Sequence, residues 1–260
     1  MLRYNHGMIE KKWQQNWKKG SRLTGEPLRA CTLLIPHAGG DLGLENARLL
    51  LLTDFLCRKG RGRESVIALL SQAESWLEGA RSLGLSVQAA SDTQVYDVAV
   101  VPRDYGQTFG MTFKARESFS CGRLLETEDY TLSELIDDFG IDALRMYFLY
   151  MGPPARDYRF RWQGLVSSYR FVERLWRLAQ HPAGDLERSG LLDLHAQVQA
   201  RLAQGKPHTA LAAVMGYVKL KEMLAVREIE AIAILLQPYA PHLSAELLEL
   251  MAAIQNDDGR

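Results

Sequence analysis

Hydrophobic and polar residues follow two patterns in the first half of the chain. Unbroken, mostly apolar runs occur at residues 31–35, 65–70, 87–90 and 95–101, and such runs suit strands that are covered on both faces. Between them, apolar residues recur at helical spacing over residues 45–59 and 72–83. Because strands and helices alternate, the pattern predicts a parallel sheet with crossover helices.

Helical periodicity dominates the two ends of the chain. Residues 8–19 place Ile9, Trp13 and Trp17 on one stripe, which is typical of a helix that packs on a domain through its apolar side. After Pro154 the pattern is helical, with a break near Pro182. We therefore expect an all-helical region after the sheet.

Two shorter segments carry local signals. Residues 131–134, Thr-Leu-Ser-Glu, form a capping box that predicts the start of a helix, and Gly140 predicts its end. Residues 102–122 combine several glycines with scattered aromatic residues, so we expect a loop and a short strand there.

Composition narrows the possible partners. The 260 residues carry no formal net charge, so any nucleic-acid surface must be a local arrangement. No apolar run reaches the roughly 18 residues of a membrane span, so we expect no membrane partner and a cytoplasmic location. Cys31, Cys57 and Cys121 are odd in number and widely spaced, which argues against disulfides and against a zinc site. We expect no bound metal.

A glycine-rich corner joins the first predicted strand to the first crossover helix. Residues 36–43 read Pro-His-Ala-Gly-Gly-Asp-Leu-Gly. Glycines allow the backbone to approach a ligand closely, and a strand that feeds a helix through glycines is a general phosphate-binding or ligand-binding corner.

This corner belongs to a longer stretch that resembles a known family. Residues 34–46 read Leu-Ile-Pro-His-Ala-Gly-Gly-Asp-Leu-Gly-Leu-Glu-Asn, and Thr-Asp-Phe-Leu-Cys-Arg follows at residues 53–58. The stretch resembles the first strand and helix of the class I leucyl-tRNA synthetases, in which a Pro-Tyr-Pro-Ser-Gly corner leads into the HIGH signature. The HIGH positions fall on residues 43–46, Gly-Leu-Glu-Asn, so both histidines that steady the ATP phosphates in that family are absent.

Other segments resemble the same family in the expected order. Residues 4–17 resemble its opening helix, residues 135–153 the segment after its KMSKS loop, and residues 162–178 the helix that leads to its anticodon-binding domain. Counting back without gaps places KMSKS on residues 121–125, Cys-Gly-Arg-Leu-Leu, which lack both lysines. The segment that holds the substrate α-amino group in that family has no counterpart here, and its editing domain is missing.

The resemblance implies an α/β fold with two domains. We expect a reduced class I aminoacyl-tRNA synthetase-like Rossmann domain over residues 1–160 and an all-α bundle of the anticodon-binding type over residues 161–260. In open α/β sheets the site lies at the carboxyl ends of the central strands, and we therefore expect it beside residues 36–46.

The resemblance also implies candidate site residues. Glu45 is the expected catalytic base, with His37 as the alternative, because a carboxylate at an emptied phosphate position suits a base or a bound amine. Glu45 and Asn46 are equally typical of a helix start, and this second interpretation stays open. The expected substrate-binding residues are Ile35, Pro36, Gly39 and Asn46.

Arginines are the candidates for contact with tRNA, although solvent exposure alone explains such residues as well. The bundle histidines His195 and His242 are expected to be structural. The arginine set comprises Arg58, Arg61, Arg170, Arg174 and Arg177.

Three functions are compatible with these residues. The first is an aminoacyltransferase that takes leucyl-tRNA, made by the cellular leucyl-tRNA synthetase, and passes the leucyl group to a small-molecule amine, as in peptidyl-nucleoside antibiotic biosynthesis. The second is a leucine–tRNA ligase that retains ATP chemistry, and the third is a non-catalytic tRNA-binding protein. Because the groups that stabilise a reacting phosphate are lost together, we expect no use of ATP and no cofactor besides leucyl-tRNA as co-substrate.

Overall fold

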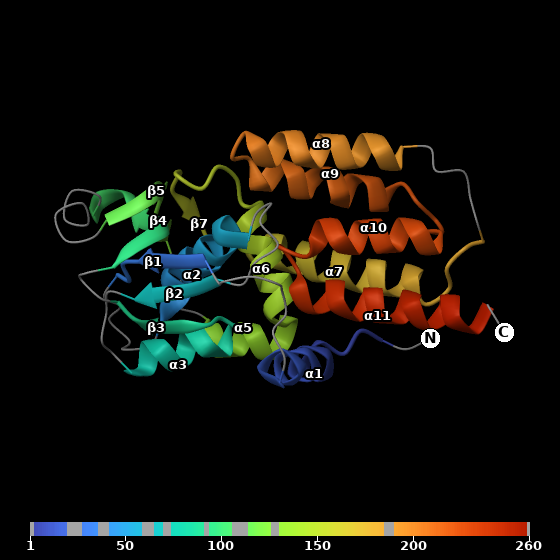
Figure 1. Ribbon diagram of the computed structural model, residues 1–260, viewed down its shortest axis with the longest axis horizontal. Coiled ribbons are helices and arrows are strands. Elements are labelled where there is room, and N and C mark those ends of the chain that lie inside the picture. The colour runs from blue at the N-terminus through green and yellow to red at the C-terminus, as the bar shows by residue number, and fades with distance from the viewer. Residues whose placement is uncertain are drawn as a thin grey trace. The chain divides into compact units, whose positions relative to one another are not determined.

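The structure is a computed structural model that describes residues 3–19, 28–35, 42–58, 65–69, 74–90, 94–105, 114–125, 130–184 and 190–258 (Figure 1). The chain divides into two compact units. The sheet unit comprises Trp17–Asp138 and Pro153–Arg161, and the helical unit comprises Met1–Asn16, Phe139–Gly152 and Trp162–Arg260. The opening segment and residues 139–152 thus group with the helices that follow residue 161.

The sheet unit is built on five parallel strands in the order β3-β2-β1-β4-β5. These strands are β1 (Leu28–Thr32), β2 (Ser65–Leu69), β3 (Val87–Ala89), β4 (Val95–Pro102) and β5 (Lys114–Cys121). The other elements of this unit are α2 (Gly43–Arg58), α3 (Glu74–Ser82), η1 (Arg103–Tyr105), α5 (Leu132–Phe139) and the short parallel pair of β6 (Leu124–Leu125) with β7 (Tyr158–Arg159). The expected parallel sheet with helical connections is confirmed.

The core of this unit lies under α2, which packs across β1, β2 and β4. The helix is apolar on nearly all sides, and Leu50, Leu51 and Phe55 are completely buried. A helix of this kind belongs in the interior of an α/β domain, so its polar side chains are buried as well and need partners.

The first strand begins earlier than the sequence predicted. It spans Leu28–Thr32 rather than residues 31–35, because only these residues pair in register with Ser65–Leu69 of β2. Ile35 leaves the ladder: its backbone N–H and C=O bond to the side chain of Asn46 at 2.8 and 2.7 Å. A side chain therefore replaces the neighbouring strand at this point.

The prediction of a loop and a short strand at residues 102–122 is wrong for most of the described part. Residues 114–121 form β5, a full strand at the edge of the sheet that pairs with β4 from Val95↔Lys114 to Pro102↔Cys121. Most of its side chains are exposed, so it shows no apolar alternation. Backbone hydrogen bonds and charged residues suffice at an edge, where apolar side chains are a liability.

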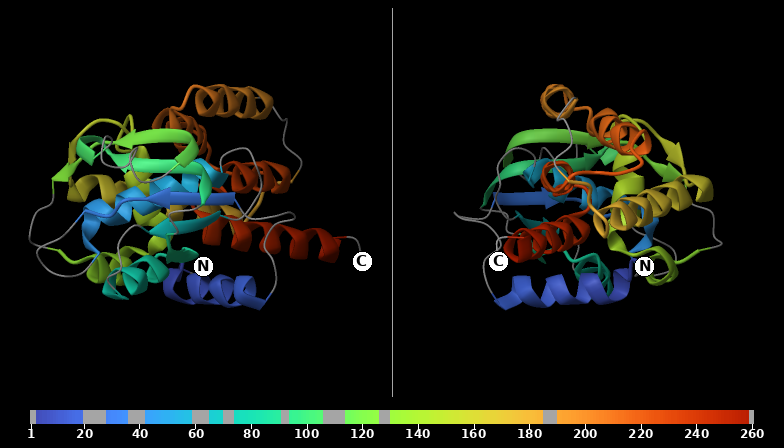
Figure 2. Two further views of the ribbon diagram at one scale, coloured as in Figure 1. Left: turned by 60° about the vertical axis from the view of Figure 1, so that its left-hand side comes forward. Right: turned by 90° about the vertical axis from the view of Figure 1, so that its right-hand side faces the viewer.

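The helical unit contains the first part of α1 and six helices after residue 139 (Figure 2). Their bounds are α1 (His6–Lys19), α6 (Ile141–Tyr150), α7 (Trp162–Ala179), α8 (Leu191–Ala203), α9 (Pro207–Lys219), α10 (Val226–Leu236) and α11 (Pro241–Asp258). The expected all-helical region is confirmed. None of the described helices combines the length and apolar character that crossing a bilayer requires.

The predicted capping box is confirmed. Thr131 N–H donates to Glu134 Oε2 at 2.8 Å, and Glu134 N–H donates to Thr131 Oγ1 at 3.3 Å, so two orphan donors at the start of α5 are satisfied. The helix ends at Phe139, directly before Gly140 as predicted. The break near Pro182 is also confirmed, since α7 ends at Ala179.

Gly140 follows the end of α5 and also allows α1 to approach the start of α6 closely. Its φ is 80°, and a Cβ there would lie 2.7 Å from His6 Cβ and 2.8 Å from Glu10 Oε1. Gly205 has a similar φ of 69° with nothing within 4 Å of the corresponding Cβ position. Alanine substitutions at these two glycines therefore distinguish the cost of backbone strain, which both share, from the cost of a steric clash, which only Gly140 has.

We predict that Gly140→Ala lowers the free energy of unfolding by about 3 kcal/mol, and Gly205→Ala by about 1 kcal/mol. Both variants force alanine into the left-handed region, but only the first also pushes α1 off the start of α6. Urea denaturation of both variants and the parent measures the difference. Equal losses for the two variants would mean that the contact with α1 is not tight in solution.

Candidate active site

The carboxyl ends of β1 and β4 form the switch point of the sheet. From β1 the chain continues to β2 and β3 on one side, whereas β4 and β5 lie on the other side of β1. In open α/β sheets this is where ligands bind. The described residues around it come from the end of β1, the first turns of α2, η1 and the end of β5.

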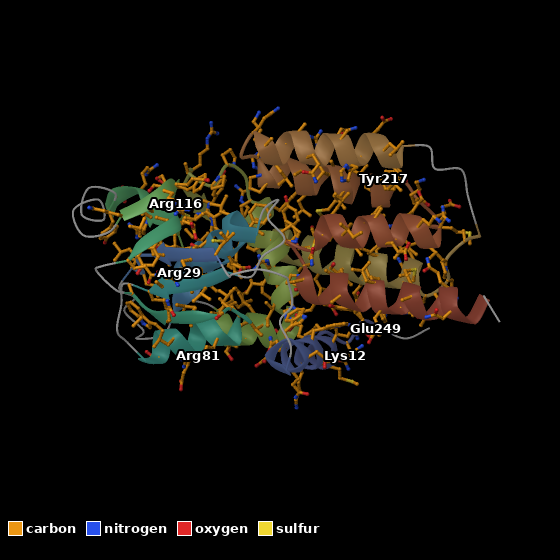
Figure 3. All side chains as sticks on the ribbon, in the orientation of Figure 1. Lys12, Arg29, Arg81, Arg116, Tyr217 and Glu249 are labelled. Atoms are coloured by element: carbon orange, nitrogen blue, oxygen red, sulfur yellow. The ribbon has the colours of Figure 1, made fainter. Side chains whose placement is uncertain are left out.

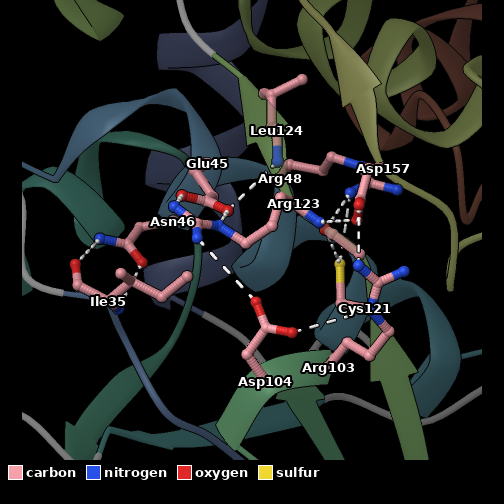
Figure 4. Close-up of polar contacts among 11 residues, drawn as sticks. Ile35, Glu45, Asn46, Arg48, Arg103, Asp104, Cys121, Arg123, Leu124 and Asp157 are labelled. Carbon is pink, nitrogen blue, oxygen red and sulfur yellow. Dashed lines mark hydrogen bonds and ion pairs between the residues drawn. The ribbon is translucent and has the colours of Figure 1, made fainter.

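An ion pair lies across this switch point (Figure 4). Arg123, two residues after the end of β5, donates through Nε to Glu45 Oε1 at 2.6 Å and through Nη2 to Oε2 at 3.4 Å. The Leu124 N–H also donates to Glu45 Oε1 at 3.2 Å. The Glu45 side chain is 16% exposed and that of Arg123 40%, so the carboxylate is the more buried partner. Hydrogen bonding to Glu45 raises the pKa of Arg123.

Three more charged residues extend the pair into a network. Asp157 Oδ1 accepts the Arg123 N–H at 2.8 Å, and its Oδ2 accepts Arg103 Nη2 at 2.8 Å. The backbone hydrogen bond from Arg123, with help from Arg103, lowers the pKa of Asp157. Asp104 lies 4.0 Å from Arg123 Nη1 and 3.8 Å from Arg103 Nε. The guanidinium groups of Arg103 and Arg123 thus both already face carboxylates.

Arg48 is the most buried cation near the site, and its contacts are with the protein itself. Its Nη1 donates to the Gly122 carbonyl at 2.7 Å, and its Nη2 donates to the Pro154 carbonyl at 3.1 Å. Nη1 also lies 3.4 Å from Cys121 Sγ, a thiol whose pKa is raised by burial. Arg48 therefore fastens the end of β5 to the segment that follows Gly152.

Gly122 is required by the close approach of that segment. A Cβ at this position would lie 2.3 Å from the backbone of Arg156, and its N–H donates to the Pro154 carbonyl at 3.0 Å. No other residue fits there without moving the backbone. The position of Arg123, one residue later, is consequently fixed by the chain on both sides.

Asn46 has a structural contact at the position where substrate binding was expected. The residue is 2% exposed, and its amide bonds both backbone groups of Ile35. This contact holds the exit of β1 against the start of α2, and it is not a helix cap, because the partner is the backbone of Ile35. Its role in substrate binding, and that of Ile35, stays a prediction.

Several predicted residues cannot be placed. The candidate base His37, the substrate residues Pro36 and Gly39, and Arg61 lie outside the described residues. Arg58 is the last residue of α2, and its side chain is likewise outside the description. Of the predicted corner, Ile35, Glu45 and Asn46 are brought together at the switch point.

The three arginines predicted on the bundle have different environments on α7. Arg170 and Arg177 are exposed. Arg174 is half-buried and donates through Nη2 to the Lys219 and Lys221 carbonyls at 3.4 and 2.6 Å, at the end of α9. Only Arg170 and Arg177 therefore present their side chains to solvent.

The predicted structural histidines differ from one another. His242 is buried and its Nδ1 lies 2.8 Å from Asp142 Oδ1, which suits a structural role. His195 is exposed on α8.

Sequence reasoning missed the cations and carboxylates that surround Glu45. Arg103, Asp104 and Asp157 belong to no motif, and nothing local in the sequence marks them. A signal existed for Arg123, since the resemblance aligns it with the middle of KMSKS and aligns Glu45 with a HIGH position. A carboxylate at one of these positions and a guanidinium at the other indicate an ion pair.

No family model matches the chain. Among solved structures, the agnB2 LeuRS of Agrobacterium radiobacter K84, in a ternary complex with tRNA and LeuAMS, is 16% identical over 60% of this chain and 27% of its own, with a TM-score of 0.48. The apo methionyl-tRNA synthetase of Mycobacterium tuberculosis is 18% identical over 59% of this chain and 43% of its own, with a TM-score of 0.45. The chain thus spans less than half the length of either protein.

We predict that Glu45 and Arg123 are energetically coupled. In a double-mutant cycle with Glu45→Gln and Arg123→Met, the coupling should be about 1–2 kcal/mol, because the carboxylate is largely removed from water. The matched control is Asp97 with Arg116, whose guanidinium is 3.2 Å away but 77% exposed (Figure 3). Its cycle should give about 0.5 kcal/mol. Urea denaturation at one salt concentration measures both cycles, and equal couplings would show that the site pair is effectively solvated.

Proposed function

We propose that the protein is a leucyl-tRNA-dependent aminoacyltransferase that passes the leucyl group to a small-molecule amine without using ATP. The specificity for leucyl-tRNA rests on the sequence resemblance described above. The observation that carries the absence of ATP chemistry is the ion pair of Glu45 with Arg123. These residues occupy the positions of the two phosphate-binding signatures and bind each other.

Charge balance at the switch point supports this proposal. Activation of an amino acid requires donors aimed at the charge that develops on a reacting phosphate, and removal of one such donor typically costs about 100-fold or more in rate. Here Arg103 and Arg123 face carboxylates, and Arg48 faces backbone carbonyls. A triphosphate would have to displace Glu45 and would meet Asp104 and Asp157 in its place. The ligase alternative is therefore disfavoured.

Transfer from charged tRNA needs none of those donors. The leucyl group is already an activated ester, so the amine nitrogen attacks its carbonyl carbon, the ester C–O bond breaks, and the tRNA hydroxyl leaves with a proton. What the protein must supply is positioning and a base that removes the proton from the attacking amine.

Two residues remain candidates for the base. Both oxygens of Glu45 already accept hydrogen bonds, from Arg123 and from Leu124, so an incoming amine has to compete with these donors. His37 follows Ile35 by two positions in the chain and carries a side chain suited to the same task. The proposal assigns the proton transfer to one of these two groups.

The closed network also favours a second candidate function, a non-catalytic tRNA-binding protein. If the contacts around Glu45 persist when tRNA binds, Glu45 is not free to take up a proton from an amine. The two functions differ in one respect that is easily measured: a transferase distinguishes charged from uncharged tRNA, whereas a binding protein treats them alike.

We predict that the parent protein adds one leucyl residue to an amine in a small-molecule extract when it is incubated with leucyl-tRNA, as detected by mass spectrometry. His37→Ala and Glu45→Gln are tested separately, and loss of the base should lower the rate about 100-fold or more. Glu117→Gln, on exposed β5, serves as the matched control and should retain the parent rate. Leucine-dependent exchange between ATP and pyrophosphate should be absent from all four proteins.

Each result of this experiment is decisive. Transfer at the parent rate in both site variants would refute the site assignment. Absence of transfer by the parent to any amine would leave the binding function, and exchange at the rate of an ordinary synthetase would restore the ligase function.

We predict that tRNA binding weakens steeply with salt although the net charge is zero, because phosphate contacts release counterions. Arg170→Gln and Arg177→Gln, which remove exposed charges, should each reduce the slope of log K against log salt by about one. Arg174→Gln is the control, since that guanidinium binds the α9 carbonyls and its loss should leave the slope unchanged. Filter binding with charged and uncharged tRNA measures the affinity and its salt slope for the parent and each variant. An affinity that does not change with salt would exclude tRNA as the partner.

A further inference from the structure

A second group of buried ionisable residues lies in the helical unit, away from the switch-point network. It comprises Glu10 from α1, Asp142 from α6 and His242 from α11, which are 5%, 1% and 2% exposed. One nitrogen or oxygen atom of each lies within 4.8 Å of those of the other two. Charged groups are rarely buried this deeply without a reason.

Each carboxyl group of this cluster caps a helix other than its own. Glu10 Oε1 accepts the N–H groups of Ile141 and Asp142, at 2.6 and 3.2 Å, at the start of α6. Asp142 Oδ2 accepts the Leu243 N–H at 2.6 Å, at the start of α11. The Glu10–Asp142–His242 cluster therefore links three helices through groups at their N-termini.

The same contacts argue against a metal ion. The carboxyl oxygens already accept backbone N–H groups, and Asp142 Oδ1 is taken by His242 Nδ1 at 2.8 Å. Two helix N-termini also direct their positive ends into the cluster, which favours anions and repels cations. The cluster can therefore gain or lose a proton, rather than bind a metal ion.

Two adjacent buried carboxylates cannot both be anionic without a large penalty. Burial, and next the charge of Asp142, raise the pKa of Glu10 to about 8, although the hydrogen bonds from α6 oppose this shift. Lys12 of the same helix binds Glu246 and Glu249 rather than Glu10 (Figure 3). The raised pKa therefore favours the protonated form of Glu10 in the folded protein.

Other ionisable groups lie near Glu10. Burial, with the charges of Asp142 and Glu10, raises the pKa of Tyr4 well above its usual value, so this phenol stays neutral. Arg145 of α6 donates to the Pro238 carbonyl at 2.9 Å. His6 lies beside Glu10 at Gly140, and its ring contacts that of Tyr169. Tyr169 of α7 and Glu246 of α11 act electrostatically on Tyr4.

We propose that the Glu10–Asp142–His242 cluster is a proton-operated latch that holds α1 on the helical unit. With a proton on Glu10, one anion remains in the cluster and α1 is docked. Without that proton two buried anions face each other, and α1 is released at its first turns. This inference does not depend on the proposed function.

The sign of the pH dependence follows from proton binding. Glu10 in free α1 loses its proton near the ordinary pKa of about 4.3, whereas in the docked state it keeps the proton up to about pH 8. Undocking therefore releases a proton throughout this range, so the latch tightens as pH falls and loosens as pH rises. Above pH 8 both states are ionised and the dependence ends.

Hydrogen exchange of the full chain at pH 5, 6, 7 and 8 tests the latch. The opening equilibrium of the α1 amides should rise by up to about tenfold per pH unit in the parent, relative to Glu10→Gln, in which a neutral amide replaces the protonated acid. Taking this ratio cancels the chemical pH dependence of exchange. Glu246→Gln is the matched control: it removes a carboxylate that holds Lys12 and Trp13 of α1 but lies outside the cluster, so it should open α1 equally at every pH.

Asp142→Asn provides a second test of the latch, in case the Glu10→Gln substitution itself prevents the docking of α1. Removal of the neighbouring anion should reduce the pH slope of the parent. Equal slopes in the parent, Glu10→Gln and Asp142→Asn would overturn the proposal. Protection of α1 by added zinc or manganese at pH 8, lost in Glu10→Gln, would also overturn it in favour of a metal site.

Discussion

The ion pair of Glu45 with Arg123 is the interaction around which the carboxyl end of the sheet is arranged. It joins the first turn of α2 to the second residue after β5, across the switch point where an α/β fold ordinarily receives a ligand. A helix start at this place normally offers positive potential to an anion. Here a carboxylate of the protein itself occupies that position, and a guanidinium holds it. The charged side chains described at this point are thereby balanced by one another.

One buried helix positions every part of this arrangement. Within four residues of α2, Glu45 binds Arg123, Asn46 binds the backbone of Ile35, and Arg48 binds the Gly122 and Pro154 carbonyls. Each side chain is fixed because the helix is apolar elsewhere and cannot slide without exposing Leu50 or Phe55. The polar groups thus owe their geometry to the apolar packing, and they in turn satisfy backbone groups that leave the ladder of the sheet.

The sequence predicted the order and type of most elements because periodicity and capping are local signals. The Thr131–Glu134 box is an example, since both partners lie within one helical turn. The end of β1 and the extent of β5 were missed for physical reasons. A side chain eleven positions away takes the backbone of Ile35, and an exposed edge strand has no apolar pattern. The same limit applies to the site. Glu45 could be named from its place in the sequence pattern, whereas Asp157 can be identified only from its contacts with Arg103 and Arg123 in the folded protein.

The two units handle buried carboxyl groups in opposite ways. Glu45 has a guanidinium within 2.6 Å, so its environment is complete when the group is ionised. Glu10 has no such neighbour among its described contacts and relies on backbone N–H groups and a proton. Arginine stays protonated over the whole physiological pH range, so the partner of Glu45 does not change its charge. The proton that the proposed latch places on Glu10, by contrast, is exchanged with solvent. The start of α6 is therefore where the proposal locates a response of the helical unit to pH.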